Sequence, residues 1–182
     1  MPEVELEPLR ESHVQGLLRK IRENNEDLSR WLPWLGDLRS VAAVREFVRE
    51  AMVMEERVTD FFYVVRCRGE ICGLVNLGEV DLYDGVATMG YWICSAHTGR
   101  GLASRAVSRL MNIAFVEKRL HKLEIRCAEK NIKSRLIPER LGFIHEANLR
   151  QSQRLRDAYV NQAIYSMLES EYFREQVAGM AR

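Results

Sequence analysis

The chain has 182 residues, with 27 Lys and Arg against 26 Asp and Glu and a formal net charge of +1. This balance creates no overall field that would attract nucleic acid or an anionic membrane surface, so neither is expected as a partner. Hydrophobic residues make up 47% of the chain, yet no apolar run approaches the roughly 20 residues of a membrane helix. The first residues lack the basic and apolar regions of a signal peptide. We therefore expect one domain over residues 1–182, located in the cytoplasm.

The first sixty residues predict one strand and two helices. Residues 4–9 alternate between apolar and polar side chains, as a strand does. Ser12 is expected to cap a first helix. The apolar side chains of that helix would be Val14, Leu17, Leu18 and Ile21. Residues 31–36 predict a loop or a short helical turn, and Ser40 is expected to cap a second helix that continues to about Arg57.

From residue 61 the pattern changes to that of strands, over residues 61–67, 70–77 and 86–94, with a hairpin around Arg68 and Gly69. All four cysteines lie in strand-like runs and lack the spacing of metal ligands. They are Cys67, Cys72, Cys94 and Cys127. We expect buried free thiols in a reducing compartment and no metal site.

The remainder of the chain alternates helices and strands. The expected elements are a helix over residues 102–120, a strand over 122–128, a helix over 132–140 that ends at Gly142, strands over 143–149 and 160–168, and a terminal helix over 169–176. The order strand, helix, strand, helix between residues 86 and 141 requires at least one parallel strand pair. The predicted fold class is α+β.

The most informative segment is residues 97–104, which joins a predicted strand to an amphipathic helix. Gly99 and Gly101 let the backbone turn tightly and bring its N–H groups close to a bulky ligand. The start of the helix adds unpaired N–H groups and the positive end of the helix dipole. These features together predict a site for phosphate oxygens, and hence a cofactor that contains a pyrophosphate.

Two motifs resemble the GNAT superfamily of acyl-coenzyme A-dependent N-acetyltransferases. Residues 91–93 followed by residues 99–103 are similar to its acetyl-CoA motif, Gln/Arg-x-x-Gly-x-Gly/Ala, although Thr98 replaces Gln or Arg. Residues 126–143 and 146–151 resemble the branch that acetylates ribosomal-protein N-termini, the RimJ/RimL type. The resemblance implies a mixed, mostly antiparallel sheet of about seven strands. Helices would flank this sheet, and a splayed parallel strand pair would bind acetyl-CoA.

The resemblance also implies roles for individual residues. The backbone N–H groups of residues 99–104 would hold the pyrophosphate, and the N–H of Ile93 would polarise the thioester carbonyl. Asn131 would bond the pantetheine amides or cap the following helix, and Ser134 would lie beside the thioester sulfur as a catalytic donor. The implied cofactor-binding residues are Tyr91, Trp92, Ile93, Thr98, Gly99, Arg100, Gly101, Leu102, Ala103, Ser104, Asn131 and Ser134.

Fewer residues point to a site for the amine that accepts the acetyl group. Gln153 stands where this branch can place a carboxylate, and glutamine cannot take a proton. Glu79 and His97 are alternative bases by position, although such side chains are more often simply solvated. Trp31 and Trp34 fall in the region that lines the acceptor groove in related enzymes, where core packing is the competing interpretation.

The sequence therefore predicts acetyl-CoA-dependent transfer to a primary amine, such as the N-terminal α-amine of a ribosomal protein. Acetylation of a small-molecule amine and a non-catalytic coenzyme A-binding module stay open as alternatives. A homodimer is also expected, because the aromatic strand at residues 159–168 could pair or pack across a two-fold axis.

Overall fold

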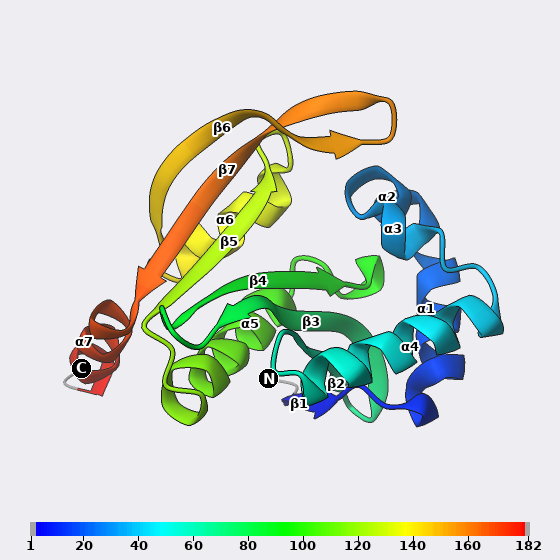
Figure 1. The fold of residues 1–182 in the computed structure, drawn as a ribbon, viewed down its shortest axis with the longest axis horizontal. Coiled ribbons are helices and arrows are strands. Elements are labelled where there is room, and N and C mark those ends of the chain that lie inside the picture. The colour runs from blue at the N-terminus through cyan, green and yellow to red at the C-terminus, as the bar shows by residue number, and fades with distance from the viewer. Residues whose placement is uncertain (1–2, 181–182) are drawn as a thin grey trace.

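The computed structural model describes the backbone of residues 3–180 and the side chains of residues 3–174 and 176. Its centre is one seven-stranded sheet in the order β1-β2-β3-β4-β5-β7-β6, shown in Figure 1. The strands are β1 (Val4–Pro8), β2 (Phe61–Cys67), β3 (Glu70–Asp81), β4 (Val86–Ile93), β5 (Lys122–Ala128), β6 (Ile144–Leu155) and β7 (Ala158–Leu168). Only the β4–β5 pair is parallel among these neighbours. The predicted mixed, mostly antiparallel sheet with flanking helices is confirmed.

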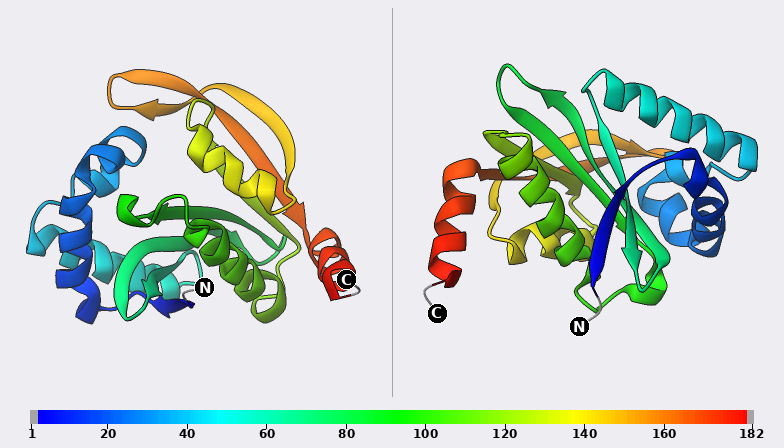
Figure 2. Two further views of the ribbon diagram at one scale, coloured as in Figure 1. Left: turned by 180° about the vertical axis from the view of Figure 1, so that it is seen from behind. Right: turned by 90° about the horizontal axis from the view of Figure 1, so that it is seen from below.

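Helices cover both faces of the sheet (Figure 2). They are α1 (Val14–Glu23), α2 (Asn25–Trp31), α3 (Pro33–Gly36), α4 (Val41–Glu56), α5 (Leu102–Asn112), α6 (Ile132–Arg140) and α7 (Glu169–Met180). One face, which we call the α4 face, lies under α1 to α4. The opposite α5 face lies under α5 and α6. None of the helices in the described part of the chain is long and apolar enough to cross a membrane.

The core has two parts because the side chains of a strand alternate between the two faces. On β4, Ala87 and Met89 join the cluster under α5. Trp92 joins the cluster under α1 and α4 instead. All four cysteines are buried free thiols, as predicted. The two faces of β4 therefore belong to two separate hydrophobic clusters and pack against different helices.

The helix boundaries agree with the sequence in two cases and differ in two. Ser40 caps α4, accepting the Ala43 N–H at 3.1 Å. Gly142 has φ of 77° and follows α6, as expected of a C′ residue. The prediction for Ser12 was wrong, because it lies in a 3-10 turn (Glu11–His13) and α1 starts at Val14 without a side-chain cap. The helix predicted to about residue 120 ends earlier, since α5 continues only as a π turn (Ile113–Glu117).

Two segments that the sequence pattern left irregular are regular in the structure. Helix α2 was not predicted, because Leu28 is its only buried apolar residue. The predicted connection over residues 150–159 extends β6 and β7 into a long hairpin that turns at Arg156 and Asp157. A register shift between Leu149 and Gln153 interrupts the alternation, and this hides the strand in the sequence.

Strand β7 is an interior strand of the sheet. It pairs with β5 over residues 162–168 and with β6 on its other side. Over residues 162–166, β7 is paired on both sides, and its backbone there has no free edge for pairing across a two-fold axis. The edge of this half of the sheet is β6. Packing across a two-fold axis, and the homodimer itself, stay a prediction.

A buried asparagine ties the α1–α2 junction to the end of β4. The Oδ1 atom of Asn24 accepts from the Ser95 N–H at 2.7 Å and from its hydroxyl at 2.9 Å. Its amide nitrogen donates to the Lys20 carbonyl at 2.8 Å. The segment that follows β4 is therefore fixed against the helices of the α4 face.

We predict that Asn24→Ala lowers the free energy of unfolding by about 1–3 kcal/mol, because it leaves buried polar groups unpaired. Urea denaturation would measure the change. Gln15→Ala, at an exposed position of α1, should stay within about 0.5 kcal/mol of the unmodified chain. Equal effects of the two substitutions would contradict the structural role of Asn24.

Candidate active site

The site begins where β4 and β5 diverge. The two strands pair at only three positions, Val86 with Lys122, Ala87 with Leu123 and Thr88 with Glu124. Beyond Thr88, β4 remains paired with β3, while β5 remains paired with β7 (Figure 1). In the described part of the chain, the β4 edge from residue 89 to 93 therefore has no strand partner on the β5 side.

One hydrogen bond shows which backbone N–H groups of β4 point toward β3 and which point into the gap. The N–H of Cys94 donates to the carbonyl of Cys72, a residue of β3, at 2.8 Å. Because N–H directions alternate along a strand, the N–H groups of Tyr91 and Ile93 point the other way, into the gap. The Ile93 N–H, which the resemblance implies as an oxyanion donor, thus lies on the open edge.

The loop after β4 has the conformation that its glycines predict. Gly99 and Gly101 have φ of 79° and 69°, in the left-handed region that favours glycine. A Cβ added at either position would meet no atom within 4 Å, so the space above the loop is open. The first bond of α5 to the loop is made by Arg105, whose N–H donates to the Gly101 carbonyl at 3.2 Å. The preceding N–H groups are free to bind phosphate oxygens.

Polar side chains on the α5 face lie next to the gap. The Tyr91 hydroxyl donates to the Ser134 carbonyl at 2.9 Å, and the Ser134 hydroxyl donates to the Tyr91 oxygen at 3.1 Å. Burial raises the pKa of Tyr91, so this phenol stays protonated. Asn131 accepts the Ser134 N–H at 3.3 Å, the capping role that the sequence offered as one of two. Burial also raises the pKa of the nearby Cys127 thiol to about 11.

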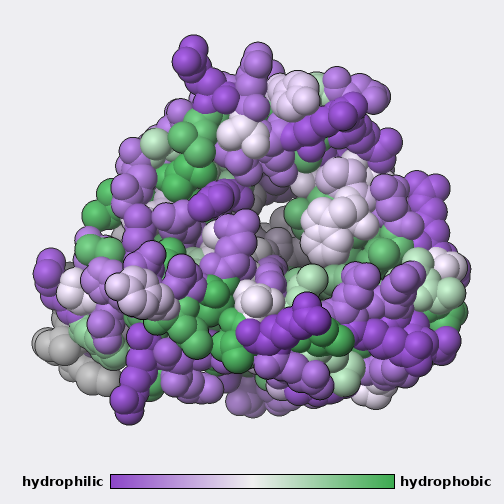
Figure 3. All heavy atoms as spheres, in the orientation of Figure 1, coloured by the Kyte–Doolittle hydropathy of each residue, from purple (hydrophilic) through white to green (hydrophobic). Residues whose placement is uncertain are grey.

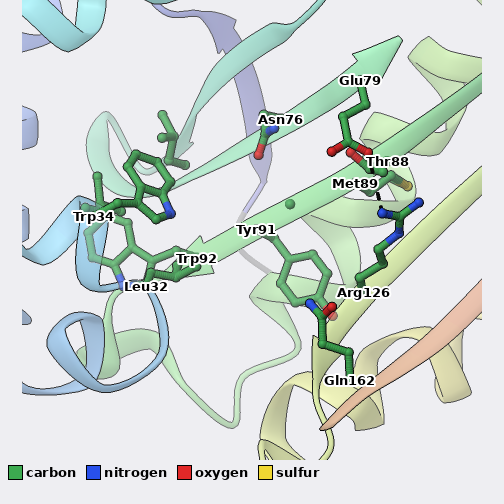
Figure 4. A pocket seen from close by; sticks show the side chains of 13 residues that line it. Leu32, Trp34, Asn76, Glu79, Thr88, Met89, Tyr91, Trp92, Arg126 and Gln162 are labelled. Carbon is green, nitrogen blue, oxygen red and sulfur yellow. Dashed lines mark ion pairs between the residues drawn. The ribbon is translucent and has the colours of Figure 1, made fainter. Parts of the chain in front are cut away.

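A cavity of about 340 Å³, which we call the central cavity, opens on the α4 face (Figures 3 and 4). Its lining residues come from α3, β3, β4, β5, β7 and the residue before α3. They are Leu32, Trp34, Leu35, Leu74, Asn76, Glu79, Thr88, Met89, Gly90, Tyr91, Trp92, Arg126 and Gln162. Since Tyr91 contacts Ser134 on the other face, the gap between the strands connects the central cavity with the α5 face.

Glu79 and Arg126 form an ion pair at 3.7 Å in the central cavity (Figure 4). Glu79 has φ of 50° and lies in an irregular stretch between Gly78 and Asp81, where the β3–β4 register shifts. Such bulges redirect side chains near functional sites. Arg126 also pairs with Glu124 at 2.9 Å. Of the two bases proposed by position, Glu79 thus lines the cavity, whereas His97 contacts the Cys72 sulfur at 3.3 Å.

Of the three residues predicted to bind the acceptor, only Trp34 lines the central cavity, with 49% of its surface exposed. Trp31 lies outside the lining set, and the Arg30 guanidinium sits 4.8 Å from the centre of its ring. Gln153 also lies outside it, half-buried on β6 opposite Val160.

Sequence reasoning missed Asn76, Arg126 and Gln162, which come from three different strands of the lining. One signal was available, because Asn76 is a polar residue in an otherwise apolar run. It pairs with Gly90, and a Cβ at that glycine would collide with the Asn76 side chain. The other two residues come together only through strand pairing.

Comparison with known proteins identifies the family of this chain. Residues 3–144 match the family model described as an acetyltransferase (GNAT) domain. The chain belongs to the GNAT acetyltransferase family, as the sequence motifs predicted. It is an acyltransferase of the EC 2.3.1 type that acetylates an amine, with acetyl-CoA as its acetyl donor.

Among curated relatives, the ribosomal-protein-serine acetyltransferase of Escherichia coli is 27% identical, covering 91% of this chain and 92% of its own. The spermidine N(1)-acetyltransferase of the same species is 31% identical, over 62% of this chain and 61% of its own. The structure of RimL, the ribosomal L7/L12 alpha-N-protein acetyltransferase, in complex with coenzyme A has a TM-score of 0.87. It is 24% identical, covering 91% of this chain and 93% of its own, and it shares the fold.

We predict that Gly101→Val weakens acetyl-CoA binding at least tenfold, about 1.4 kcal/mol. A β-branched side chain is strained at this φ and would cover the N–H groups that face the phosphates. Calorimetry on the folded variant would measure the affinity. Gly69→Val is a matched control, because Gly69 has φ of 79° in the turn before β3. It should keep the affinity, and an equal loss in both variants would contradict the site.

Proposed function

We propose that this enzyme transfers the acetyl group to the α-amine at the N-terminus of a protein, such as a ribosomal protein. The relative named for that reaction matches nearly the whole chain, which supports the proposal. The residues that line the central cavity give the main support for an α-amine acceptor. Among the residues that line it, Glu79 is the one carboxylate, and it is already paired with Arg126.

This composition suits an amine that needs little help to lose its proton. An α-amine has a pKa of about 7.7–8.0, so deprotonating it at pH 7 costs about 1 kcal/mol. A lysine side chain, with a pKa near 10.4, costs roughly 4 kcal/mol or more. The central cavity therefore favours an α-amine or another weakly basic amine over lysine. Glu79 is the residue that would orient the incoming amine and take its proton.

The donor would bind across the gap between β4 and β5. Its pyrophosphate would lie on the N–H groups of residues 99–104, and Arg100 would add positive charge. The pantetheine arm would follow the open edge of β4, where the N–H groups of Tyr91 and Ile93 are available. Acetyl-CoA supplies a thioester that is activated for attack by an amine.

Two groups of the chain would assist the transfer. The Ile93 N–H would donate to the carbonyl oxygen as it gains negative charge, an interaction worth roughly 3 kcal/mol in comparable sites. The Ser134 hydroxyl would turn from the Tyr91 oxygen to the departing sulfur. A thiol has a pKa of about 8.5, so a hydroxyl donor suffices and no strong acid is required.

A small-molecule amine is the second candidate acceptor. The spermidine acetyltransferase relatives favour it, at 31% identity over 113 residues. That match covers less of the chain than the ribosomal-protein relative does. The two candidates differ in the charge of the acceptor, since spermidine is a polycation.

Paired peptides would test the proposed acceptor at pH 7. One peptide has a free α-amine and an acetylated lysine, and the other has a blocked α-amine and a free lysine. We predict faster acetylation of the first peptide, because its amine is more often neutral. Release of free coenzyme A thiol measures both rates, with spermidine as the third acceptor. Faster reaction of the lysine peptide or of spermidine would contradict the proposal.

We also predict that Ser134→Ala lowers kcat about tenfold or more. The KM for acetyl-CoA should change less, because donation to sulfur strengthens as the thiolate forms. Steady-state kinetics would separate the two constants. Ser170→Ala, at an exposed position of α7, serves as the control. An unchanged kcat in the Ser134 variant would assign the donor role to water or to another residue.

A further inference from the structure

A second cavity, of about 580 Å³, lies between α2 and the turn of the β6–β7 hairpin. Its lining residues are Asn25, Glu26, Ser29, Arg30, Arg39 and Arg156. We call it the arginine cavity. Figure 1 shows the hairpin reaching over to α2 from the opposite half of the sheet. Segments far apart in the sequence therefore build this cavity, as they build the central cavity.

The hairpin is fastened to α2 at this point. The Arg156 Nε atom donates to the Ser29 carbonyl at 2.8 Å, which leaves its two terminal nitrogens for other partners. Arg156 has φ of 52°, in the left-handed region that residues with a Cβ adopt only at a cost. The bond to Ser29 holds the guanidinium over the cavity despite this cost.

The arginine cavity has an excess of positive charge. It contains three guanidinium groups and one carboxylate, that of Glu26. Among the described side chains, those of residues 3–174 and 176, no carboxylate forms an ion pair with Arg30, Arg39 or Arg156. The Arg22 guanidinium donates to the Arg39 carbonyl at 2.8 Å and brings another positive charge alongside. Guanidinium groups that have no carboxylate partner within the protein are suited to binding the carboxylates of a ligand through paired hydrogen bonds.

The two cavities are neighbours along the chain. Arg30 lines the arginine cavity and Leu32 lines the central cavity, so their Cα atoms lie at most about 7 Å apart. An extended peptide advances about 3.3 Å per residue. A peptide whose first amine enters the central cavity would therefore bring residues a few positions later over the arginine cavity.

We infer that the acceptor is an acidic N-terminal segment, whose Asp or Glu side chains, a few positions after the acetylated amine, bind Arg30, Arg39 and Arg156. This inference rests on the proposed function and adds a charge requirement to it. A polycation such as spermidine would be repelled at the same place. RNA is disfavoured as the occupant, because Glu26 lies in the cavity and the net charge of the whole chain is only +1.

The test uses three peptides that share a Ser-Ala start and continue with four Glu, four Gln or four Arg residues. The inference predicts the highest kcat/KM for the Glu peptide and the lowest for the Arg peptide. Raising the ionic strength should reduce this preference, because exposed charges are screened. The double variant Arg30→Gln/Arg39→Gln should reduce the ratio of Glu to Gln peptide about tenfold, because each exposed ion pair contributes modestly. Arg19→Gln, at an exposed arginine of α1, should leave the ratio unchanged.

Binding of an N-terminally acetylated Glu peptide, followed by fluorescence anisotropy, separates this inference from the proposed function. Binding that depends on Arg30 and Arg39, without acetylation of any free peptide, would support the acidic site and overturn α-amine transfer. Equal acetylation of the three peptides would keep α-amine transfer and overturn the charge requirement. The charge requirement is also contradicted if the Arg30→Gln/Arg39→Gln variant keeps the same ratio of Glu to Gln peptide as Arg19→Gln. It is likewise contradicted if a single-stranded RNA displaces the Glu peptide at a lower concentration than a second acidic peptide does.

Discussion

The early end of the β4–β5 pairing is the constraint on which the functional part of the structure depends. After three parallel pairs the strands separate, because β4 stays paired with β3 and β5 stays paired with β7. A buried strand edge without a partner would normally carry an energetic penalty. Here that penalty is avoided only if a ligand or water bonds the free groups. The gap thus provides hydrogen-bond donors for an extended substrate and a passage through the sheet.

The separation of β4 and β5 also places the groups suited to the donor and those suited to the acceptor on opposite faces of the sheet. On the α5 face lie the glycine loop, the start of α5 and the Tyr91–Ser134 pair, all suited to the donor. On the α4 face lie Trp34 and the Glu79–Arg126 pair, suited to an amine. Because β4 side chains alternate between faces, one strand serves both sides. The reacting groups can then meet in the gap without crossing the core.

The glycine loop and α5, which form the proposed donor side, were largely predictable from the sequence, because their signals are local. The conformation of Gly99 and Gly101 follows from residue type, and apolar periodicity marks α5. The acceptor side was less predictable. Helix α2 offers one buried apolar residue, and a bulge conceals the full length of β6. Arg126 and Gln162 reach the central cavity only through strand order, which no local pattern reveals.

Because the proposed donor side is local and the proposed acceptor side is not, the acceptor can change within the family more easily than the donor. The proposed donor site uses the backbone N–H groups of one loop, and these groups are present whatever side chains the loop carries, Thr98 included. The proposed acceptor side is assembled from α2, α3, the β3 bulge and the β6–β7 turn, which come from three separate parts of the chain. Substitutions in any of these can change the charge at the entrance while the donor site stays intact. The curated relatives of this family are accordingly named for acceptors as different as a ribosomal protein and spermidine. In this chain, the proposed acidic acceptor would meet Arg30, Arg39 and Arg156 at that entrance.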